Sequence, residues 1–383
     1  MGLIIDKLGR VAARAFAANG LVYRMRRAGL RRVEGADELP ELDGARHRIL
    51  SLRPRLEVPL PRPHDSWPDT PAVDISVIIP CYNAERFVCE AVRSVQGQRC
   101  EATIEVIAVD DGSTDGTLPL LGEMADEDGR LRVVSQQNRG FSGARNAGLR
   151  VSRGASIVFV DADDVLAPGA LQVLYSKLKS TGVDYVTGMY RYVDERGRAI
   201  PVGKKRPSGV AWGRIFDREV WRALEFPEGV WFEDTVHAYM VAPRFMEARV
   251  DDVVYSYRKQ AGSITSTSRS SKRSVDTFFV TEAMLAWREA MGLPFDQQTY
   301  DQTLYQLGTL LANRTVALDD DESRCLFAIA SNLIKTVSGG GSLRAVPQKN
   351  GSTSKDRSWK ATTSCGAWSQ HRYSSYDACM QAS

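Results

Sequence analysis

Four short apolar runs between residues 74 and 169 constrain the fold of this chain more than any other feature. Continuous Val and Ile residues are typical of strands that are buried on both faces of a parallel sheet. Stretches with helical periodicity separate the runs, which predicts βαβ crossovers. We therefore predict an α/β fold with a mostly parallel, Rossmann-like sheet flanked by helices, with strands at Ile75–Ile79, Ile104–Val109, Leu131–Ser135 and Ile157–Val160.

A polar cluster directly follows each predicted strand. In parallel α/β sheets, ligands bind in the crevice at the carboxyl ends of the strands. The four clusters are therefore expected to line one crevice, and they are Pro80-Cys81-Tyr82-Asn83, Asp110–Gly116, Asn138–Gly148 and Asp161–Asp164. Because no histidine lies near Cys81 in the sequence, this cysteine is predicted to be a small filler at the strand end rather than a nucleophile.

The last of these clusters carries the clearest chemical signal. Asp161, Asp163 and Asp164 place three carboxylates within four residues. Their mutual repulsion favours a bound cation, and the hard cations Mn²⁺ and Mg²⁺ prefer carboxylate and phosphate oxygens. Such an ion would offset charge on a departing phosphate. An isolated Asp-x-Asp is more often a turn or a cap, so the metal prediction depends on the position after a strand.

In order and spacing, these segments resemble the inverting GT-A-type glycosyltransferases of family 2. The resemblance spans residues 74–267 and is carried by residues 77–83, 109–117, 138–148 and 161–164 and by the later pair Glu233-Asp234. It implies a metal-dependent hexosyl- or N-acetylhexosaminyltransferase that uses a nucleotide diphosphate sugar, with a UDP-sugar favoured. The acceptor it implies is a hydroxyl of a cell-surface glycan, a teichoic-acid-like polymer or a lipid-linked molecule.

The same resemblance assigns nucleotide-binding residues. Tyr82 would offer an aromatic face to the base, and Asp111 is favoured over Asp110 for accepting hydrogen bonds from the base or ribose. Arg145 suits a phosphate or a carboxylate of the metal motif. A core tyrosine, turn-forming or capping acids and a surface arginine are the structural alternatives. The predicted set is Pro80, Tyr82, Asn83, Asp110, Asp111, Asn138, Arg145, Asp161 and Arg258, the last of which would reach the diphosphate.

Asp234 is expected to be the catalytic base. By resemblance, an acidic residue at this point deprotonates the acceptor hydroxyl, and Glu233 would orient it or lie beside it. Inversion requires a base on the face opposite the leaving nucleotide, so one carboxylate suffices. The alternative is that both acids merely favour the N-terminus of a helix. His237, three residues further on, is interpreted as a packed or exposed histidine.

Two segments precede the predicted glycosyltransferase domain. Residues 1–33 read as a basic amphipathic helix that either contacts an anionic membrane surface or packs on the domain with its basic side solvated. Residues 34–73 contain seven prolines and are predicted to form an extended linker.

The domain itself is predicted to span residues 74–270, with a nucleotide-binding half at 74–185 and an acceptor half at 186–270. Residues 271–337 read as a helical appendage, with helices at Val275–Met291, Gln297–Leu318 and Glu322–Val337. The Ser/Thr/Gly-rich residues 338–383 have few aliphatic side chains and are predicted to be disordered.

Properties of the whole chain narrow the location and partners. A net charge of only +3 implies no global electrostatic partner, and no nucleic acid is expected. The six cysteines show no paired metal spacing, which predicts reduced thiols and a cytoplasmic location, at the inner face of the cell membrane if residues 1–33 contact it. No apolar run reaches the roughly 18 residues that a transmembrane helix needs.

Two other classes of protein compete with the glycosyltransferase. A sugar nucleotidyltransferase also uses an Asp-bound metal, but it places a Gly-rich loop with Arg and Lys after the first strand, where this chain has residues 80–85. A non-catalytic scaffold that binds a nucleotide sugar or docks on a membrane would be free to lose the metal and base carboxylates. This chain retains both, so the glycosyltransferase is favoured.

Overall fold

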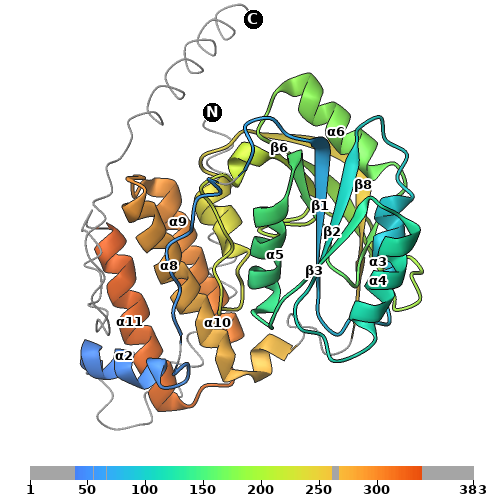
Figure 1. The fold of residues 1–383 in the computed structure, drawn as a ribbon. Coiled ribbons are helices and arrows are strands. Elements are labelled where there is room, and N and C mark those ends of the chain that lie inside the picture. Colours follow the sequence, from blue (N-terminus) through green and yellow to red (C-terminus); the bar gives the residue numbers. More distant parts are fainter. Residues whose placement is uncertain (1–38, 55, 66, 261–266, 339–383) are drawn as a thin grey trace, which may run out of the picture. The chain divides into compact units, whose positions relative to one another are not determined.

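The computed structural model describes residues 39–54, 56–65, 67–260 and 267–338. Its centre is an eight-stranded sheet with the order β3-β2-β1-β4-β7-β6-β8-β5 (Figure 1). The predictions for residues 1–33 and for the tail, apart from Ser338, lie outside the described residues. The strands are β1 (Val73–Cys81), β2 (Ile104–Asp110), β3 (Leu131–Ser135), β4 (Gly154–Phe159), β5 (Val165–Leu166), β6 (Tyr185–Val193), β7 (Arg214–Asp217) and β8 (Glu247–Arg258).

Strands β3, β2, β1 and β4 are parallel, so their carboxyl ends share one edge of the sheet. This arrangement confirms the predicted fold class. Strand β1 continues two residues beyond the predicted end, through Pro80, which pairs with Val109 of β2. The register between β1 and β4 ends at Ile78 and Phe159, so Pro80 lies beyond the last residue pair of these two strands, a position where proline is tolerated.

Helices cover both faces of this parallel half. Helices α3 (Val88–Gln96), α4 (Thr117–Glu127) and α6 (Ala170–Thr181) bury apolar side chains on one face, and α5 (Gly140–Val151) packs on the other (Figure 1). A Cβ atom at Gly148 would lie 2.4 Å from Ile78 Cγ2, so glycine is needed for α5 to approach β1 this closely. This contact fixes the position of the α5 side chains one turn earlier.

The second half of the sheet is mixed. Strand β7 is antiparallel to both β4 and β6, so β6 runs in the same direction as β4. Strand β8 is parallel to β6, with register shifts around Met189, and β5 is antiparallel to β8. Two short helical turns lie between β7 and β8: the 3-10 turn Arg218–Val220 and the π-helical turn His237–Val241.

The C-terminal part is helical, as predicted. It contains 3-10 turns at Ser268–Ser270 and Lys272–Val275, helix α8 (Asp276–Ala290), helix α9 (Gln297–Leu304) continued by the π-helical turn Tyr305–Leu310 and α10 (Leu311–Arg314), and α11 (Asp320–Ser338). The second helical stretch ends at Arg314, four residues before its predicted end.

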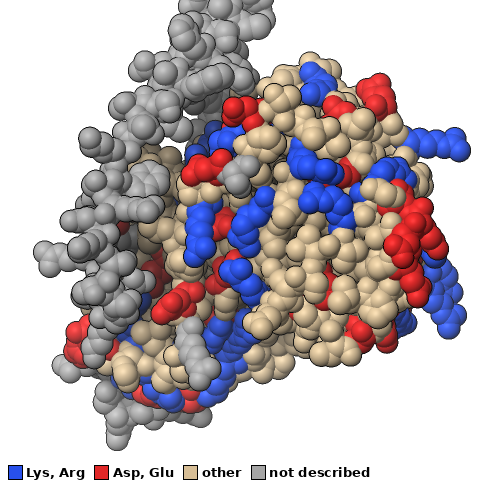
Figure 2. Space-filling model, viewed as in Figure 1, with Lys and Arg blue, Asp and Glu red and all other residues tan. Residues whose placement is uncertain are grey.

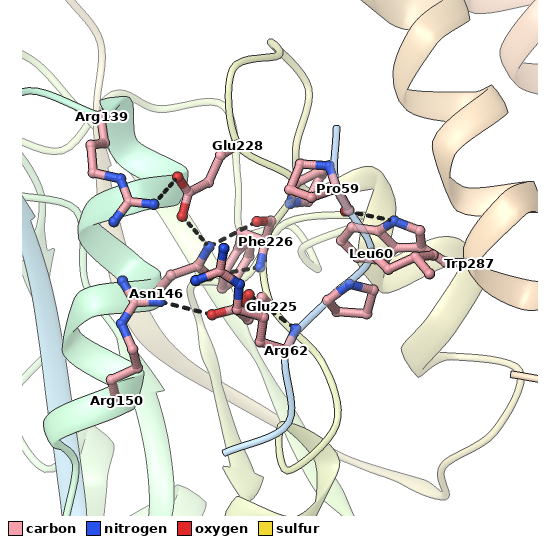
Figure 3. Close-up of a pocket in the computed structure, with 12 residues that line it drawn as sticks. Pro59, Leu60, Arg62, Arg139, Asn146, Arg150, Glu225, Phe226, Glu228 and Trp287 are labelled. Atoms are coloured by element: carbon pink, nitrogen blue, oxygen red, sulfur yellow. Dashed lines mark hydrogen bonds and ion pairs between the residues drawn. The ribbon is translucent and has the colours of Figure 1, made fainter. Parts of the chain in front are cut away.

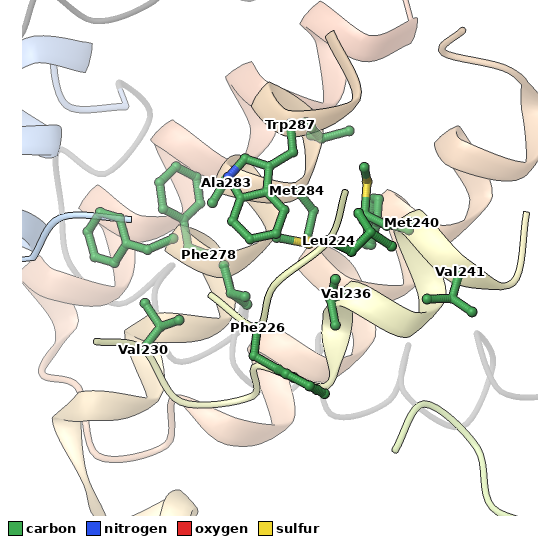
Figure 4. Close-up of a cluster of buried hydrophobic side chains, with 14 of the residues drawn as sticks. Leu224, Phe226, Val230, Val236, Met240, Val241, Phe278, Ala283, Met284 and Trp287 are labelled. Carbon is green, nitrogen blue, oxygen red and sulfur yellow. The ribbon is translucent and has the colours of Figure 1, made fainter. Parts of the chain in front are cut away.

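These helices share a core with the acceptor half instead of folding as a separate appendage. Figure 4 shows side chains of both parts in one cluster, with Phe226 and Val236 of the acceptor half beside Phe278 and Met284 of α8. Burial of large apolar side chains stabilises both parts together. The acceptor side of the molecule is therefore expected to unfold with the helices.

The linker prediction for residues 34–73 omits a helix that the structure contains. Helix α2 (Leu42–Leu50) begins after Glu41, whose carboxylate accepts hydrogen bonds from two backbone N–H groups of the first turn. Its buried Ala45 and Ile49 pack on the C-terminal core, and Arg46 forms a two-bonded ion pair with Glu282 of α8. The prolines of this segment lie outside residues 41–53, which leaves room for a short helix.

Candidate active site

The loops after β1 and β2 are tied together at the carboxyl edge of the sheet. Asn83 has a positive φ of 47°, which is uncommon for a residue other than glycine. Its N–H donates to Ser113 Oγ, and its side-chain oxygen accepts from the N–H of Thr114 at 2.8 Å. The Asn83 side chain therefore holds the two loops together. Tyr82, beside it, is 52% exposed and leaves its ring open to a ligand.

Asp110 and Asp111 are both buried, but they differ in the acceptor atoms they leave open. Asp111 Oδ1 accepts from the N–H of Arg139 at 2.9 Å and from Gln136 Nε2 at 2.7 Å. Asp111 Oδ2 has no hydrogen-bond partner in the described part of the chain. A buried acceptor without a partner is costly, and a ligand N–H or hydroxyl would satisfy it. This geometry supports the preference for Asp111.

Arg139 and helix α5, which follows it, line one side of a hollow of about 40 Å³. Arg139 forms an ion pair with Glu228 at 2.7 Å, and Asn146 donates to the carbonyl oxygen of Phe226 and to Glu228 (Figure 3). These bonds attach α5 to the loop that leads to Glu233. Asn138 lies before Arg139 and is exposed. Its side-chain oxygen accepts a hydrogen bond from the N–H of Gly140 at 3.3 Å.

Arg145 joins the two acidic motifs. It is buried in α5, with Nη2 2.8 Å from Asp161 Oδ1 and Nη1 2.5 Å from Glu233 Oε1, and its guanidinium lies 5.2 Å from the ring of Phe226. Burial by itself would lower the pKa of Arg145, but the charges of Asp161 and Glu233 outweigh it and raise the pKa. A permanently charged, two-ended donor thus holds the metal motif and the base motif together.

The turn after β4 presents the metal motif. The N–H of Asp161 donates to the Tyr255 hydroxyl at 3.0 Å, and Asp163 Oδ2 accepts from Gln260 Nε2 at 2.5 Å. Burial, followed by the charge of Asp161, raises the pKa of Asp163 to about 6. A bound cation would relieve this penalty on the charged carboxylate.

Asp164 departs from the predicted metal set. It is 1% exposed, and its Oδ1 accepts the N–H of Arg258 at 2.7 Å, so its carboxylate fixes strand β8 to the turn. Burial and the two neighbouring aspartates raise its pKa. Within the described ranges, no three His, Cys, Asp or Glu side chains form a group that could hold a metal. The partly exposed Asp161 and Asp163 instead fit a hard cation that completes its coordination with phosphate and water.

Arg258 is held by protein groups around the turn after β4. The side chain is buried, donates to the carbonyl oxygen of Asp163 at 2.8 Å and forms an ion pair with Glu90 of α3 at 2.6 Å. Successive side chains of a strand point to opposite faces, and Arg258 lies on the α3 face, over the Phe87 ring. These contacts fix the turn that carries Asp163 to helix α3.

Glu233 and Asp234 begin the turn that precedes the π-helical segment. Glu233 is buried against Arg145, and burial raises its pKa. Asp234 is partly exposed, and its Oδ1 accepts the N–H of Ala211 at 3.2 Å. Burial, followed by the charge of Glu233, raises the pKa of Asp234 well above its usual value. A raised pKa of this kind is common among the acids and bases of functional sites.

The sequence analysis missed the backbone that aims this acidic pair. Phe232 has a positive φ of 67°, an unusual conformation for an aromatic residue. The guanidinium of Arg314 from α10 lies 3.7 Å from its ring centroid, and the N–H of Trp231 donates to the buried Asp276 of α8 at 2.8 Å. No local sequence signal marks Phe232, because the contacts that hold it come from the helical part. His237 is buried between Tyr185 and Phe216, and burial lowers its pKa to about 3, which fits the packed alternative.

Comparisons with known proteins agree with this architecture. Residues 76–230 match the family model described as Glycosyl transferase family 2. The glycosyltransferase GlyG of Streptococcus pneumoniae serotype 4 is 29% identical over 223 residues, which are 50% of this chain and 73% of GlyG. The uncharacterized glycosyltransferase EpsJ of Bacillus subtilis is 29% identical over 216 residues, which are 50% of this chain and 62% of EpsJ.

A crystal structure of S. aureus TarS 1-349 in complex with UDP superposes with a TM-score of 0.53 and 18% sequence identity, over 70% of this chain and 87% of that one. The fold is therefore that of a GT-A glycosyltransferase. The match over residues 76–230, together with these relatives, supports a family 2 glycosyltransferase, which is an enzyme of the glycosyltransferase class.

Two further observations concern the described residues and the surface that they form. No helix among them is long and apolar enough to cross a membrane. Figure 2 shows Lys and Arg side chains interspersed with Asp and Glu on the face that it displays, without a broad field of one sign. This distribution agrees with the small net charge.

Proposed function

We propose that this enzyme is a metal-dependent, inverting hexosyl- or N-acetylhexosaminyltransferase that moves a sugar from a UDP-type donor to an acceptor hydroxyl. The observation that carries the proposal is the Arg145 bridge, which joins Asp161 of the strand-end acidic motif to Glu233 beside Asp234. Donor-side and acceptor-side carboxylates thus lie on either end of one guanidinium. Both motifs are thus close enough to act on one donor and one acceptor.

On the donor side, Tyr82 would stack on the base and Asp111 Oδ2 would accept a hydrogen bond from the base or ribose. Asp161 and Asp163 would hold Mn²⁺ or Mg²⁺ against the diphosphate, and the bound ion would offset the charge that develops on the leaving group. Arg145 keeps Asp161 oriented for this task and remains charged throughout.

On the acceptor side, Asp234 would take the proton of the acceptor hydroxyl. The acceptor oxygen then forms a bond to the anomeric carbon, while the bond from that carbon to the diphosphate oxygen breaks on the opposite face. The nucleoside diphosphate leaves with the bonding electron pair, and the anomeric configuration inverts. The raised pKa of Asp234 increases its basicity, since the carboxylate holds a proton more strongly than an exposed aspartate does.

The acceptor that we propose is a cell-surface glycan, a teichoic-acid-like polymer or a lipid-linked glycan. We place the reaction in the cytoplasm, with residues 1–33 as the segment that would contact the inner face of the cell membrane. Both proposals rest on the family and on the basic N-terminal sequence, which lies outside the described residues.

The experiment that tests the proposed function is product analysis with a panel of nucleotide sugars, Mn²⁺ and glycan acceptors. A transferase releases one nucleoside diphosphate for each acceptor modified, and NMR of the product shows the inverted anomer. Release of pyrophosphate would instead identify a nucleotidyltransferase. Binding of donors without any product from a broad acceptor panel would favour the scaffold and contradict the proposal.

A further inference from the structure

An aromatic surface lies at the carboxyl ends of β6 and β8, and the reaction steps above do not use it. Tyr190, Tyr192 and Tyr257 form it, with ring centroids 5.3 to 6.4 Å apart, and Trp212 lies behind them, 5.0 Å from Tyr190. We call these three tyrosines the tyrosine shelf. All three are half-buried, whereas Trp212 is buried, so the shelf has one packed side and one accessible side.

Two lysines lie over the shelf. The ammonium groups of Lys205 and Lys259 are 5.1 and 4.5 Å from the centroid of the same ring, that of Tyr192. Both lysines are exposed, and neither forms a salt bridge with any carboxylate in the part of the chain that the structure describes. Two like charges beside one ring repel each other, so an anion between them would be stabilised.

Two connections attach the shelf to the reaction centre. Tyr255 stacks on Trp212 at 4.6 Å, and its hydroxyl accepts the N–H of Asp161. Trp212 follows Ala211, whose N–H donates to Asp234. The metal turn and the base are therefore each one contact away from the aromatic group behind the shelf.

Strand direction places the shelf at the edge where the donor would bind. Strands β6 and β8 run parallel to β4, so their carboxyl ends lie at the same edge as the metal turn. Arg258, the residue after Tyr257, points toward Phe87 and Glu90 of α3. Tyr257 lies on the other face of the strand, because successive side chains alternate. Tyr257 and Arg258 therefore point to opposite faces of β8.

We propose that the tyrosine shelf is an acceptor subsite for a glycan that carries a negatively charged group. The tyrosines would pack against the apolar face of a sugar ring, and Lys205 and Lys259 would bind a carboxylate or phosphate on that sugar or its neighbour. This inference rests on the proposed function, since it assigns the acceptor of the same reaction. It narrows the acceptor from any hydroxyl-bearing glycan to an anionic one.

The test measures acceptor binding without donor, by isothermal titration and saturation-transfer NMR. Three probes separate the sources of charge: a hyaluronan tetrasaccharide with carboxylates, a glycerol phosphate trimer with phosphates, and neutral cellotetraose. The variants are the double substitution Lys205→Gln and Lys259→Gln and the matched control Lys204→Gln. Lys204 belongs to the same basic loop but donates to the backbone oxygen of Asp251.

We expect at least one anionic probe to bind more tightly than cellotetraose. The double variant should bind that probe about tenfold more weakly, because two charge-assisted contacts are lost, while the Lys204 variant should bind it as the wild type does. Binding that weakens with added salt would add support.

Equal affinity for neutral and anionic probes, no binding of any probe, or no effect of the double variant would overturn the proposal. Donor binding by thermal shift is measured on the same samples. If the wild type binds no donor, the proposed function is contradicted. If it binds a donor but the acceptor probes give one of the contrary results above, only the proposed subsite is contradicted.

Discussion

The proposed donor side and the proposed acceptor side of this enzyme are assembled in different ways. On the donor side, Asp111 is held by Gln136 and Arg139, which both come from the loop after β3, 25 and 28 residues along the chain. On the acceptor side, Glu233 is held by Arg145, 88 residues away, and the preceding turn is held by Asp276 of α8. Consecutive βαβ units therefore build the donor side, whereas the acceptor side depends on distant elements.

The two sides also share one electrostatic element. Burial raises the pKa of Asp163 on one side and of Asp234 on the other, and Arg145 contributes the positive charge between the motifs. A change confined to one side should leave the other intact. A change at Arg145 should affect both, and this difference can be measured.

The largest effect is expected for Asp234→Asn, which changes only the acceptor side. The amide cannot accept the proton, so kcat should fall by about 100- to 10,000-fold. Donor affinity and stability should remain close to wild type, because the side chain keeps its size and its bond from Ala211. Steady-state release of nucleoside diphosphate measures this split, with the exposed Asp252→Asn as control. An Asp234→Asn enzyme with wild-type turnover would show that another group is the base.

Arg145→Met should damage both sides at once. It leaves Glu233 buried without its cation, which is expected to cost about 3–5 kcal/mol in the free energy of unfolding. Urea unfolding measures this loss, and the added substitution Glu233→Gln should recover part of it. Arg150→Met provides the control, since Arg150 lies on the same helix and its ion pair with Glu225 is more exposed. Equal losses in the free energy of unfolding for the two arginine substitutions would contradict the role of Arg145 as the bridge between the motifs.

Tyr82→Ala tests the donor side alone. The ring is half exposed, so stability should change little. Loss of base stacking is expected to weaken donor binding by about 1–3 kcal/mol, without changing the turnover of a saturated enzyme. Donor KM and kcat, measured separately, distinguish this outcome from a general loss of structure. A fall in kcat with KM unchanged would be inconsistent with a base-stacking role.

The smallest effect concerns pH. The pKa of Asp163 rises from 3.8 to about 6 in the folded protein, so the folded state holds this proton more strongly than the unfolded state. Without metal, wild type should therefore lose stability relative to Asp163→Asn as the pH rises from 3.8 to 6. Stabilisation by Mn²⁺ with donor should appear as the pH rises through about 6, because the ion binds the charged form. Thermal unfolding between pH 4 and 8 measures both, and a metal effect that is equal at pH 4.5 and 7.5 would argue against Asp163 as the ligand.

The same contrast explains what could be predicted from the sequence. The strands β1 to β4 are continuous apolar runs, each followed by its polar cluster, so the donor side was predictable. For Arg145, the sequence predicted a partner that is either a phosphate or a carboxylate of the metal motif, and it did not decide between them. Its partner Glu233 depends on how closely α5 packs, through Gly148, on β1. Those distances are set by tertiary packing, which has no local pattern.

Asp164, Arg258 and helix α2 also show that tertiary contacts decide what the sequence alone leaves open. Arg258 and Asp164 have the right chemistry for a phosphate and a metal, but alternation along β8 and burial in the turn direct them to each other. Helix α2 went unpredicted because the prolines around it dominate the composition of residues 34–73. For Arg258 and Asp164, the sequence identifies the chemistry of the side chain but not the partner that decides its role.

The proposed function depends most on the binding of a nucleotide sugar by the strand-end aspartates and a divalent cation. The most direct test is a thermal-shift screen of UDP-, GDP- and other nucleotide sugars, with and without Mn²⁺, on wild type, Asp163→Ala and Asp234→Asn. We predict a metal-dependent rise in Tm for one donor in wild type and in Asp234→Asn, and no such rise in Asp163→Ala. Cooperative unfolding of the wild type without a shift for any donor, or an unchanged shift in Asp163→Ala, would contradict the claim.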